Sequence, residues 1–368
     1  MLMITISLCM IVKNEEKTLA ACLESVRDIA DEIIVVDTGS NDKTKKIAAG
    51  YTDEIYDFEW IDDFSAARNF AFSKARMDYI LWLDADDRIR EEERAKFLKL
   101  KEELPPDVDA VMMKYDTGFD EAGNVNFSYY RERLVRRSRN FRWREPVHEH
   151  LAVGGNVLNA DIHITHAKTG AHEGGRNIRI YEAMLEAGKE LSPRGTYYYA
   201  RELKDNGRHA DAARQFRRFL DGGKGWREDN IAACGELARC YAALGDKRAE
   251  FRALTQSFLY DAPRAELCCQ LGYHFKGKEE YRLAAFWFET ALRLEEPTDG
   301  WGFVQHDCYG YIPSLECAVC YDKLGDPVKA ELYNEAAARY KPESPAVLYN
   351  RRYFQGQRAK AVEALKQE

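Results

Sequence analysis

Long apolar runs and an excess of basic charge are both missing from the sequence. No segment reaches the roughly 20 consecutive apolar residues that a helix needs to cross a bilayer, and we expect no transmembrane segment. The chain has 54 Lys and Arg against 62 Asp and Glu, a formal net charge of -8, which disfavours a nucleic-acid partner. Residues 1–12, MLMITISLCMIV, lack the basic start and small-residue cleavage site of a secretory leader, so we expect a first strand there.

A disulfide framework is also absent from the pattern of cysteines. The nine cysteines are an odd number, are scattered, and stand mostly among apolar residues. We therefore expect buried thiols in a reducing, cytoplasmic environment. Cys317 and Cys320 have the C-x-x-C spacing of metal and redox sites, but they share a helix face with Leu324, so packing in a core is the favoured interpretation.

The first part of the chain, up to about residue 167, alternates strand-like and helix-like segments. Residues 4–12, 31–37 and 79–83 are short apolar runs typical of buried strands. Residues 14–28 have one apolar stripe and the start signals of a helix, with Asn14 as its expected cap. This alternation predicts an α/β fold with a mixed, mainly parallel sheet covered by helices on both faces.

From about residue 190 the pattern is helical throughout. Pairs of helices with small and aromatic residues are predicted, each pair joined by a turn that contains Gly207, Gly245, Gly277 or Gly325. The irregular period is close to that of tetratricopeptide repeats, which stack into a curved binding surface. We therefore predict three parts: an α/β domain (1–167), a linker (168–190) and an all-α tetratricopeptide-like repeat domain (191–368).

The stretch YILWLDADDRI, residues 79–89, places Asp84, Asp86 and Asp87 directly after a buried strand. Carboxylates gathered at a strand end repel each other unless they are solvated, protonated or bridged by a cation. If the chain stays extended, Asp84 and Asp86 point the same way. Asp37 ends another predicted strand, and ligands of such sheets bind beyond the carboxyl ends of strands. A solvated strand end that caps the next helix is the plainer alternative.

Four short motifs then resemble one known family. The segments MIVKNEE, VVDTGSNDKT, DFSAARN and LWLDADD have the order and spacing of family-2 glycosyltransferases with a GT-A fold, over roughly the first 165 residues. With the repeats that follow, the chain is similar to bacterial family-2 transferases that carry tetratricopeptide repeats. That group includes peptide S-glycosyltransferases.

The resemblance implies transfer of a sugar from a nucleotide sugar, usually a UDP-sugar, with inversion at the anomeric carbon. It also implies a cofactor, Mg²⁺ or Mn²⁺, at the D-x-D motif, here Asp84-Ala85-Asp86. These cations prefer oxygen ligands. A further ligand is expected from His166, for which a purely structural role is the alternative.

The nucleotide-sugar contacts that the family implies fall on five positions. Asp84 and Ala85 of the D-x-D motif lie at the donor, and Asp37 lies near the uridine. Many relatives have a second Asp where this chain has Thr38, so Thr38 is expected to share in recognition of the base. Arg68 lies where the family places a basic residue near the nucleotide, although a helix-surface charge is the plainer interpretation.

An inverting transfer needs a base that takes the acceptor's proton. The segment WREPVHEHL, residues 143–151, supplies Glu149 as the first candidate and His148 as the second. Trp143 beside them offers an apolar surface for a sugar. An ordinary loop is an equal alternative for this segment.

The expected acceptor is a peptide or protein, modified at Cys or at Ser/Thr and docked on the repeats, which can also bind a second subunit in a homodimer. One rival acceptor is a cell-envelope or lipid-linked saccharide, for which the Arg-rich residues 131–144 supply the only support. The alternative interpretation of residues 131–144 is an edge strand whose arginines keep it soluble. A second rival is a non-catalytic repeat scaffold with a degenerate transferase domain, because Asp37-Thr38 departs from the family's pattern.

Overall fold

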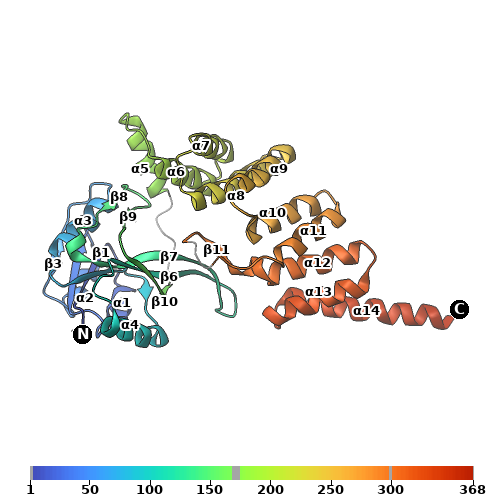
Figure 1. Ribbon diagram of the computed structural model, residues 1–368, viewed down its shortest axis with the longest axis horizontal. Helices are drawn as coiled ribbons and strands as arrows, with labels where there is room; N and C mark the ends of the chain where they lie inside the picture. The colour runs from blue at the N-terminus through green and yellow to red at the C-terminus, as the bar shows by residue number, and fades with distance from the viewer. Residues whose placement is uncertain (1–2, 168–174, 298–300, 368) are drawn as a thin grey trace. The chain divides into compact units, whose positions relative to one another are not determined.

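The computed structural model describes residues 3–167, 175–297 and 301–367, and the chain divides into two compact units, Met1–Tyr198 and Tyr199–Glu368. Figure 1 shows a sheet with flanking helices in the first unit and paired helices in the second. The predicted linker falls partly on residues 168–174, which lie outside the described residues. The rest of it carries helix α5 (Arg176–Glu186). The three domain boundaries stay a prediction.

The main sheet of the first unit has the strand order β3-β2-β1-β4-β7-β6-β10-β5. The pairs β1–β2, β1–β4, β2–β3 and β6–β10 are parallel, whereas β4–β7, β6–β7 and β5–β10 are antiparallel. This confirms the predicted mixed, mainly parallel sheet. The strand bounds are β1 Ile6–Val12, β2 Glu32–Asp37, β3 Ile55–Asp57, β4 Tyr79–Trp82, β5 Asp87–Arg88, β6 Ala110–Phe119, β7 Val125–Arg136 and β10 Val157–His166.

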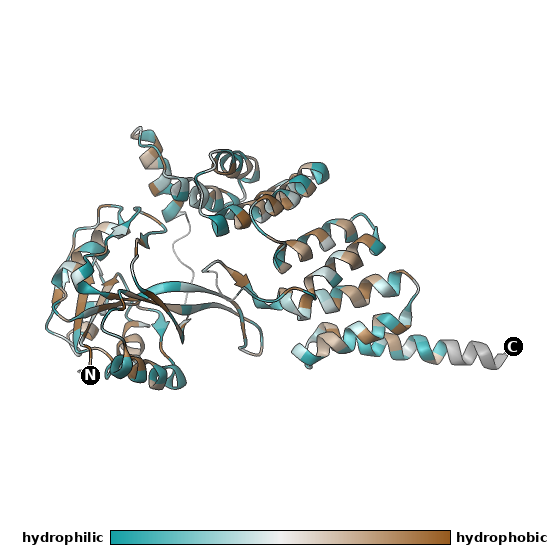
Figure 2. Cartoon of the chain, in the orientation of Figure 1, coloured by the Kyte–Doolittle hydropathy of each residue, from teal (hydrophilic) through white to brown (hydrophobic). Residues whose placement is uncertain are grey.

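Hydrophobic cores lie on both faces of this sheet, because side chains alternate along each strand. Leu81 packs in one core with α1 and α4, whereas Ile80 and Trp82 pack in the other with α3. Figure 2 shows the hydrophobic residues along these strands. The helices are α1 Leu19–Ser25, α2 Thr44–Ala48, α3 Phe64–Lys74 and α4 Glu91–Glu103, and a separate small sheet pairs β8 (Trp143–Arg144) with β9 (His150–Leu151).

The expected cap of the first helix is wrong. Asn14 has a left-handed backbone (φ 58°), and α1 begins only at Leu19. The Asn14 side chain instead accepts a hydrogen bond from the Asn41 backbone N–H at 2.9 Å, and the Asn14 backbone N–H donates to Ser40 at 2.9 Å. Asn14 therefore connects the ends of β1 and β2 rather than starting a helix.

The second unit consists of helical pairs. Gly207, Gly245 and Gly325 adopt left-handed φ values of 75°, 77° and 78° at the ends of the first helices, where glycine is favoured. The fourth expected turn differs, because Gly277 has φ -66° and Glu279 takes the left-handed position with φ 60°. The bounds are α6 Pro193–Asp205, α7 His209–Asp221, α8 Arg227–Ala243, α9 Lys247–Gln256, η2 Ser257–Leu259, α10 Ala265–Lys276, α11 Tyr281–Ala291, β11 Val304–Gln305, η3 His306–Tyr309, α12 Tyr311–Lys323, α13 Pro327–Tyr340 and α14 Pro345–Gln367.

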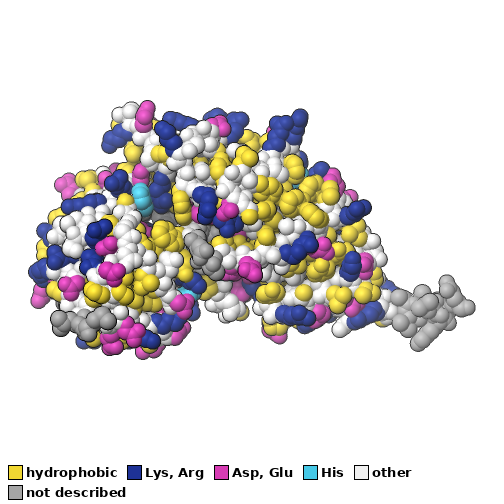
Figure 3. Space-filling view, viewed as in Figure 1, with side chains coloured by type: hydrophobic (Ala, Val, Ile, Leu, Met, Phe, Trp, Pro, Cys, Tyr) yellow, Lys and Arg dark blue, Asp and Glu magenta, His cyan; other side chains and the backbone are white. Residues whose placement is uncertain are grey.

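Packing of the repeats explains their cysteines. Cys317 and Cys320 are fully buried in a core shared with Cys268, Cys269 and Cys308. All nine cysteines are free thiols, so the packing interpretation of the C-x-x-C spacing is confirmed. Figure 3 shows further hydrophobic side chains on the surface over α9 to α11. Within the described residues, no helix is both long and apolar enough to span a membrane.

Candidate functional site

The predicted donor residue Asp37 lies at the carboxyl end of β2. Its Oδ1 accepts hydrogen bonds from the backbone N–H groups of Gly39 (2.9 Å) and Ser40 (2.8 Å). Its Oδ2 is buried and has no hydrogen-bond partner among the described residues. Thr38 is committed elsewhere, since its hydroxyl donates to the Val12 carbonyl at 3.1 Å. Asp37 therefore offers a buried acceptor oxygen at the edge where we expect the donor.

Arg68, on α3, joins two other predicted site residues. Its Nη2 lies 2.6 Å from Asp84 Oδ1, and its Nε lies 2.6 Å from Glu149 Oε1. The guanidinium is buried and lies 4.9 Å from the ring centres of both Trp82 and Trp143. This placement excludes the interpretation of Arg68 as a helix-surface charge.

The charge on Asp84 is balanced by neighbouring arginines. Burial by itself would raise the pKa of Asp84, but the charges of Arg68 and Arg133 outweigh it and lower that pKa to about 2. Asp84 is therefore an ionised partner of Arg68 at neutral pH.

The chain turns directly after Asp84, so the condition under which Asp84 and Asp86 would point the same way, an extended chain, is not met. β4 ends at Trp82. The Asp84 backbone N–H then donates to Asp87 Oδ2 at 2.9 Å, and the Asp87 N–H donates to the Asp84 carbonyl at 3.0 Å. This tight turn buries Ala85, and β5, which follows it directly, pairs with the end of β10.

Asp86, Asp87 and His166 form a group whose potential ligand atoms all lie within 4.8 Å of one another. His166 Nδ1 is 3.5 Å from Asp86 Oδ1 and 3.9 Å from Asp87 Oδ1. The antiparallel pairing of β5 with β10 brings His166 opposite Asp87. The structure thus brings two predicted ligands, Asp86 and His166, together with Asp87.

The electrostatics of this group favour a bound cation. Burial and the negative charges of Asp84 and Asp87 raise the pKa of Asp86. The Asp87 carboxylate, 3.9 Å from His166 Nδ1, and the charge of Asp86 raise the pKa of His166. Asp87 Oδ1 is fully buried and has no hydrogen-bond partner within the described residues. A carboxylate oxygen left in this state fits a metal ligand.

Arg133 holds this group and was not singled out from the sequence. Its fully buried Nη1 lies 2.9 Å from Asp87 Oδ2, and its guanidinium lies between the rings of Trp82 (4.0 Å) and Tyr115 (4.3 Å). The Tyr115 hydroxyl lies 3.0 Å from His166 Nδ1. The sequence signal was the Arg-rich stretch 131–144. The interpretation of that stretch as an edge strand is wrong, because β7 lies between β4 and β6.

The segment 143–151 has two different parts. Trp143 is buried and packs edge-on against Phe72 (5.7 Å) and Trp82 (4.8 Å), so the expected sugar-stacking surface is wrong. His148 has a left-handed backbone (φ 52°), and its ring stacks on Tyr198 at 4.4 Å. Of the two candidate bases, Glu149 is therefore the one that shares a network with Asp84, through Arg68.

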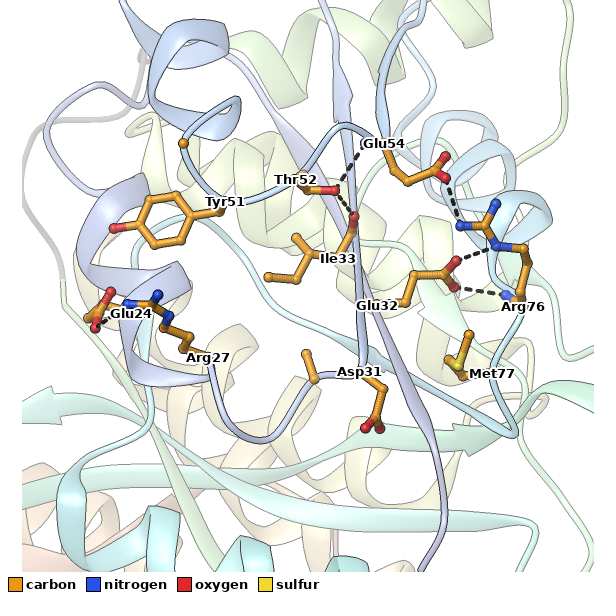
Figure 4. Close-up of a pocket in the computed structure, with 12 residues that line it drawn as sticks. Glu24, Arg27, Asp31, Glu32, Ile33, Tyr51, Thr52, Glu54, Arg76 and Met77 are labelled. Carbon is orange, nitrogen blue, oxygen red and sulfur yellow. Dashed lines mark hydrogen bonds and ion pairs between the residues drawn. The ribbon is translucent and has the colours of Figure 1, made fainter.

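A cavity of about 670 Å³ lies at the opposite edge of the sheet, at the amino ends of β2, β3 and β4. Figure 4 shows Glu32 and Glu54 directed at Arg76. Arg76 lies 2.6 Å from each of these carboxylates, and Asp31 lies 2.7 Å from the Lys101 ammonium. The acidic groups of this cavity are thus matched by cations, and the predicted site residues lie elsewhere.

Comparison with known proteins identifies the N-terminal part. The model of the family Glycosyl transferase family 2 matches residues 7–163. A TPR repeat-containing protein of Synechococcus elongatus is 40% identical over 147 residues, which are 40% of this chain and 35% of that protein. The SPbeta prophage-derived glycosyltransferase SunS of Bacillus subtilis is 31% identical over 217 residues, which are 54% of this chain and 49% of SunS.

The chain thus spans about half or less of the length of these curated relatives. Among solved structures, glucosyl-3-phosphoglycerate synthase from Mycobacterium tuberculosis with Mg²⁺ and UDP gives a TM-score of 0.35 at 14% identity, over 51% of this chain and 81% of that one. The family match confirms the resemblance of the four motifs. Residues 7–163 thus match Glycosyl transferase family 2, and helical pairs with the layout of tetratricopeptide repeats follow them.

Proposed function

We propose that this family-2 glycosyltransferase domain transfers a sugar from a UDP-sugar to a peptide or protein acceptor in the cytoplasm, with inversion at the anomeric carbon. The group Asp86–Asp87–His166 is the observation that carries the proposal. Its surplus of negative charge and the unpartnered Asp87 Oδ1 suit a divalent cation. A degenerate domain would not be expected to retain two carboxylates and a histidine whose ligand atoms lie this close together.

The cation site that we propose retains Asp86 and His166 of the predicted set. Asp84 is the third predicted ligand, but its Oδ1 is paired with Arg68. We therefore propose Asp87 as the third ligand in place of Asp84. Bound Mg²⁺ or Mn²⁺ would offset the charge that develops on the leaving diphosphate. Arg133 bonds Asp87 Oδ2 and thereby leaves Asp87 Oδ1 directed at Asp86 and His166.

The donor's nucleotide would lie beyond the ends of β2 and β4. Asp37 Oδ2 is suited to accept a hydrogen bond from an N–H of the base or a hydroxyl of the ribose. Ala85 is buried in the turn, so its backbone rather than its side chain would face the donor. Thr38, whose hydroxyl is bonded to the Val12 carbonyl, would contribute to the shape of the nucleotide site. Arg68 would act through its ion pair with Asp84 rather than by direct contact with a phosphate.

The base that we propose is Glu149. Arg68 holds its Oε1, which leaves Oε2 to take the proton of the acceptor. The acceptor's oxygen or sulfur then bonds to the anomeric carbon while the bond from that carbon to the diphosphate oxygen breaks, and UDP leaves with the electron pair. His148, stacked on Tyr198, would position the acceptor rather than remove its proton.

A peptide or protein remains the acceptor that we favour, with the repeats as its docking surface or as the contact of a homodimer. The rival saccharide acceptor drew its support from the basic stretch 131–144. Arg133 of that stretch is fully buried, and Arg131 lies over the Trp82 ring at 4.7 Å. These charges serve the interior of the site, so they do not argue for a membrane-facing surface.

Calorimetric titration of UDP with and without Mn²⁺ tests the proposal on the wild type, Asp86→Ala and the control Asp53→Ala. Asp53 is exposed near β3, at the other edge of the sheet. We expect Mn²⁺-dependent binding that Asp86→Ala weakens by about tenfold or more and that Asp53→Ala leaves unchanged. Absence of UDP binding with Mn²⁺ present would overturn the UDP-sugar proposal.

A further inference from the structure

The repeat unit binds a segment of its own chain, between α11 and α12. Residues 301–305 lead into the short helix η3, and β11 (Val304–Gln305) gives them an extended course. The helix η3, which follows this segment, is anchored in the repeat unit. Cys308 is buried, and Asp307 lies 2.7 Å from the Lys341 ammonium. Residues 302–305 are partly buried.

Three successive repeats each contact this segment through their first helix. Arg201 of α6 lies over the Phe303 ring at 5.1 Å. Glu228 of α8 lies so close to Gly302 that a Cβ atom there would come within 2.9 Å of its carboxylate. Glu266 of α10 accepts a hydrogen bond from the Gln305 backbone N–H at 3.0 Å. The segment therefore crosses the row of first helices as an extended ligand would.

The chemistry of these contacts is not particular to this segment. Arg201 accepts any aromatic ring, Glu266 Oε1 accepts any backbone N–H, and Glu228 requires only a residue without a bulky side chain. The other carboxylate oxygen of Glu266, Oε2, accepts a hydrogen bond from the Tyr309 hydroxyl of η3 at 3.0 Å, which orients the side chain. The surface thus suits a peptide with a small residue, then an aromatic residue, then an extended backbone.

We propose that the first helices α6, α8 and α10 form a binding surface for an extended peptide with a small residue followed by an aromatic one, and that residues 301–305 occupy this surface in cis. A partner peptide with this pattern competes with the segment. The inference deepens the proposed role of the repeats in docking a peptide. It concerns binding only, so its failure is distinguishable from failure of the proposed sugar transfer.

The test uses a fluorescent synthetic peptide with the sequence WGFVQH, residues 301–306, and the full-length protein. In one variant residues 301–305 are replaced by glycine and serine; in a milder one, Phe303→Ala, the backbone stays as it is. Because the occupied surface reduces apparent affinity by the fraction that is open, we expect the replaced variant to bind the peptide about tenfold or more tightly than the wild type. Phe303→Ala should fall between them.

Two further variants identify the surface. In the replaced background, Arg201→Ala should weaken peptide binding by about threefold. Phe286→Ala should not change it, because Phe286 is exposed on α11, a helix outside the proposed surface of α6, α8 and α10. Equal binding by the wild type and the replaced variant, or no binding by either, would overturn the proposal. Loss of helical circular dichroism in the replaced variant would also overturn it, because the segment would then be core. UDP titration of the same proteins reports on the transferase site separately.

Discussion

The two edges of the main sheet both gather carboxylates, but they balance them differently. At the amino edge Glu32 and Glu54 share Arg76, and Asp31 has Lys101. At the carboxyl edge Asp86 and Asp87 meet His166, and Asp87 Oδ1 has no hydrogen-bond partner among the described residues. The comparison teaches that a count of acidic residues does not indicate a cation site. A buried carboxylate oxygen that no donor of the protein contacts, such as Asp87 Oδ1, is the better indicator.

The largest expected effect is a difference in stability between variants of two arginines, the buried Arg133 at the carboxyl edge and the exposed Arg76 at the amino edge. Arg133→Met leaves Asp87 as a buried charge without its partner, and we expect a loss of about 3–5 kcal/mol in the free energy of unfolding. The comparison variant is Arg76→Met. The Arg76 side chain is 60% exposed, and its partner Glu32 keeps a hydrogen bond from the Ser7 hydroxyl, so this variant should lose less stability than Arg133→Met. Urea denaturation of both variants measures the difference. Similar losses would contradict the view that the Arg133–Asp87 pair is the buried support of the site.

A second contrast sets two histidines of β10 against each other. His166→Ala removes a proposed ligand, and we expect Mn²⁺ binding to weaken by about tenfold or more. His163, which lies 2.9 Å from Asp116, is the control, and His163→Ala should leave Mn²⁺ affinity unchanged. Calorimetry without nucleotide measures both. Equal affinity in His166→Ala and the wild type would remove His166 from the site.

The pH dependence of Mn²⁺ binding follows from the same charges. The pKa values of Asp86 and His166 are both raised, and a metal requires both groups without their protons. Protons therefore compete more strongly as the pH falls. Because the pKa of His166 lies above the ordinary histidine value of about 6.5, Mn²⁺ affinity should still be rising with pH above that value. Titrations at several pH values check the direction. An affinity that increases toward acid pH would contradict the assignment.

The smallest expected effect comes from one hydroxyl. Tyr115→Phe removes the group 3.0 Å from His166 Nδ1 but keeps the ring beside Arg133. Loss of a single neutral hydrogen bond costs about 0.5–1.5 kcal/mol, so we expect a severalfold change in Mn²⁺ affinity and little change in unfolding. Tyr129→Phe is the control, because its ring lies beside Tyr115 (5.6 Å) on the same sheet. Equal effects of the two variants would show that Tyr115 does not act on His166.

Local patterns in the sequence sufficed for much of the fold. Short apolar runs mark β1, β2 and β4, and glycines mark the ends of three repeat helices. The place of Asp37 at a strand end follows from the same reasoning. The start of α1 was missed because Asn14 bonds to the backbone of Asn41, a contact between loops 27 residues apart that no local pattern reports.

The candidate site was only partly accessible in this way. Asp86 and His166 were expected together, and the structure places them together. The turn after Asp84 makes Asp87, rather than Asp84, the proposed ligand. It depends on hydrogen bonds between Asp84 and Asp87, which the alternation of side chains along a strand does not predict. Trp143 was expected at the surface beside the acceptor, whereas it packs under Arg68 in the core.

By itself, the sequence determined which chemistry the chain carries: carboxylates at strand ends, buried thiols, and repeats of paired helices. These follow from periodicity, charge and turn residues, which act over a few positions. Only the tertiary structure decided which carboxylate oxygens Arg68 and Arg133 contact and which, such as Asp87 Oδ1, remain for a cation. That choice depends on strand order, because β7 inserted between β4 and β6 brings Arg133 to Asp87 from 46 residues away.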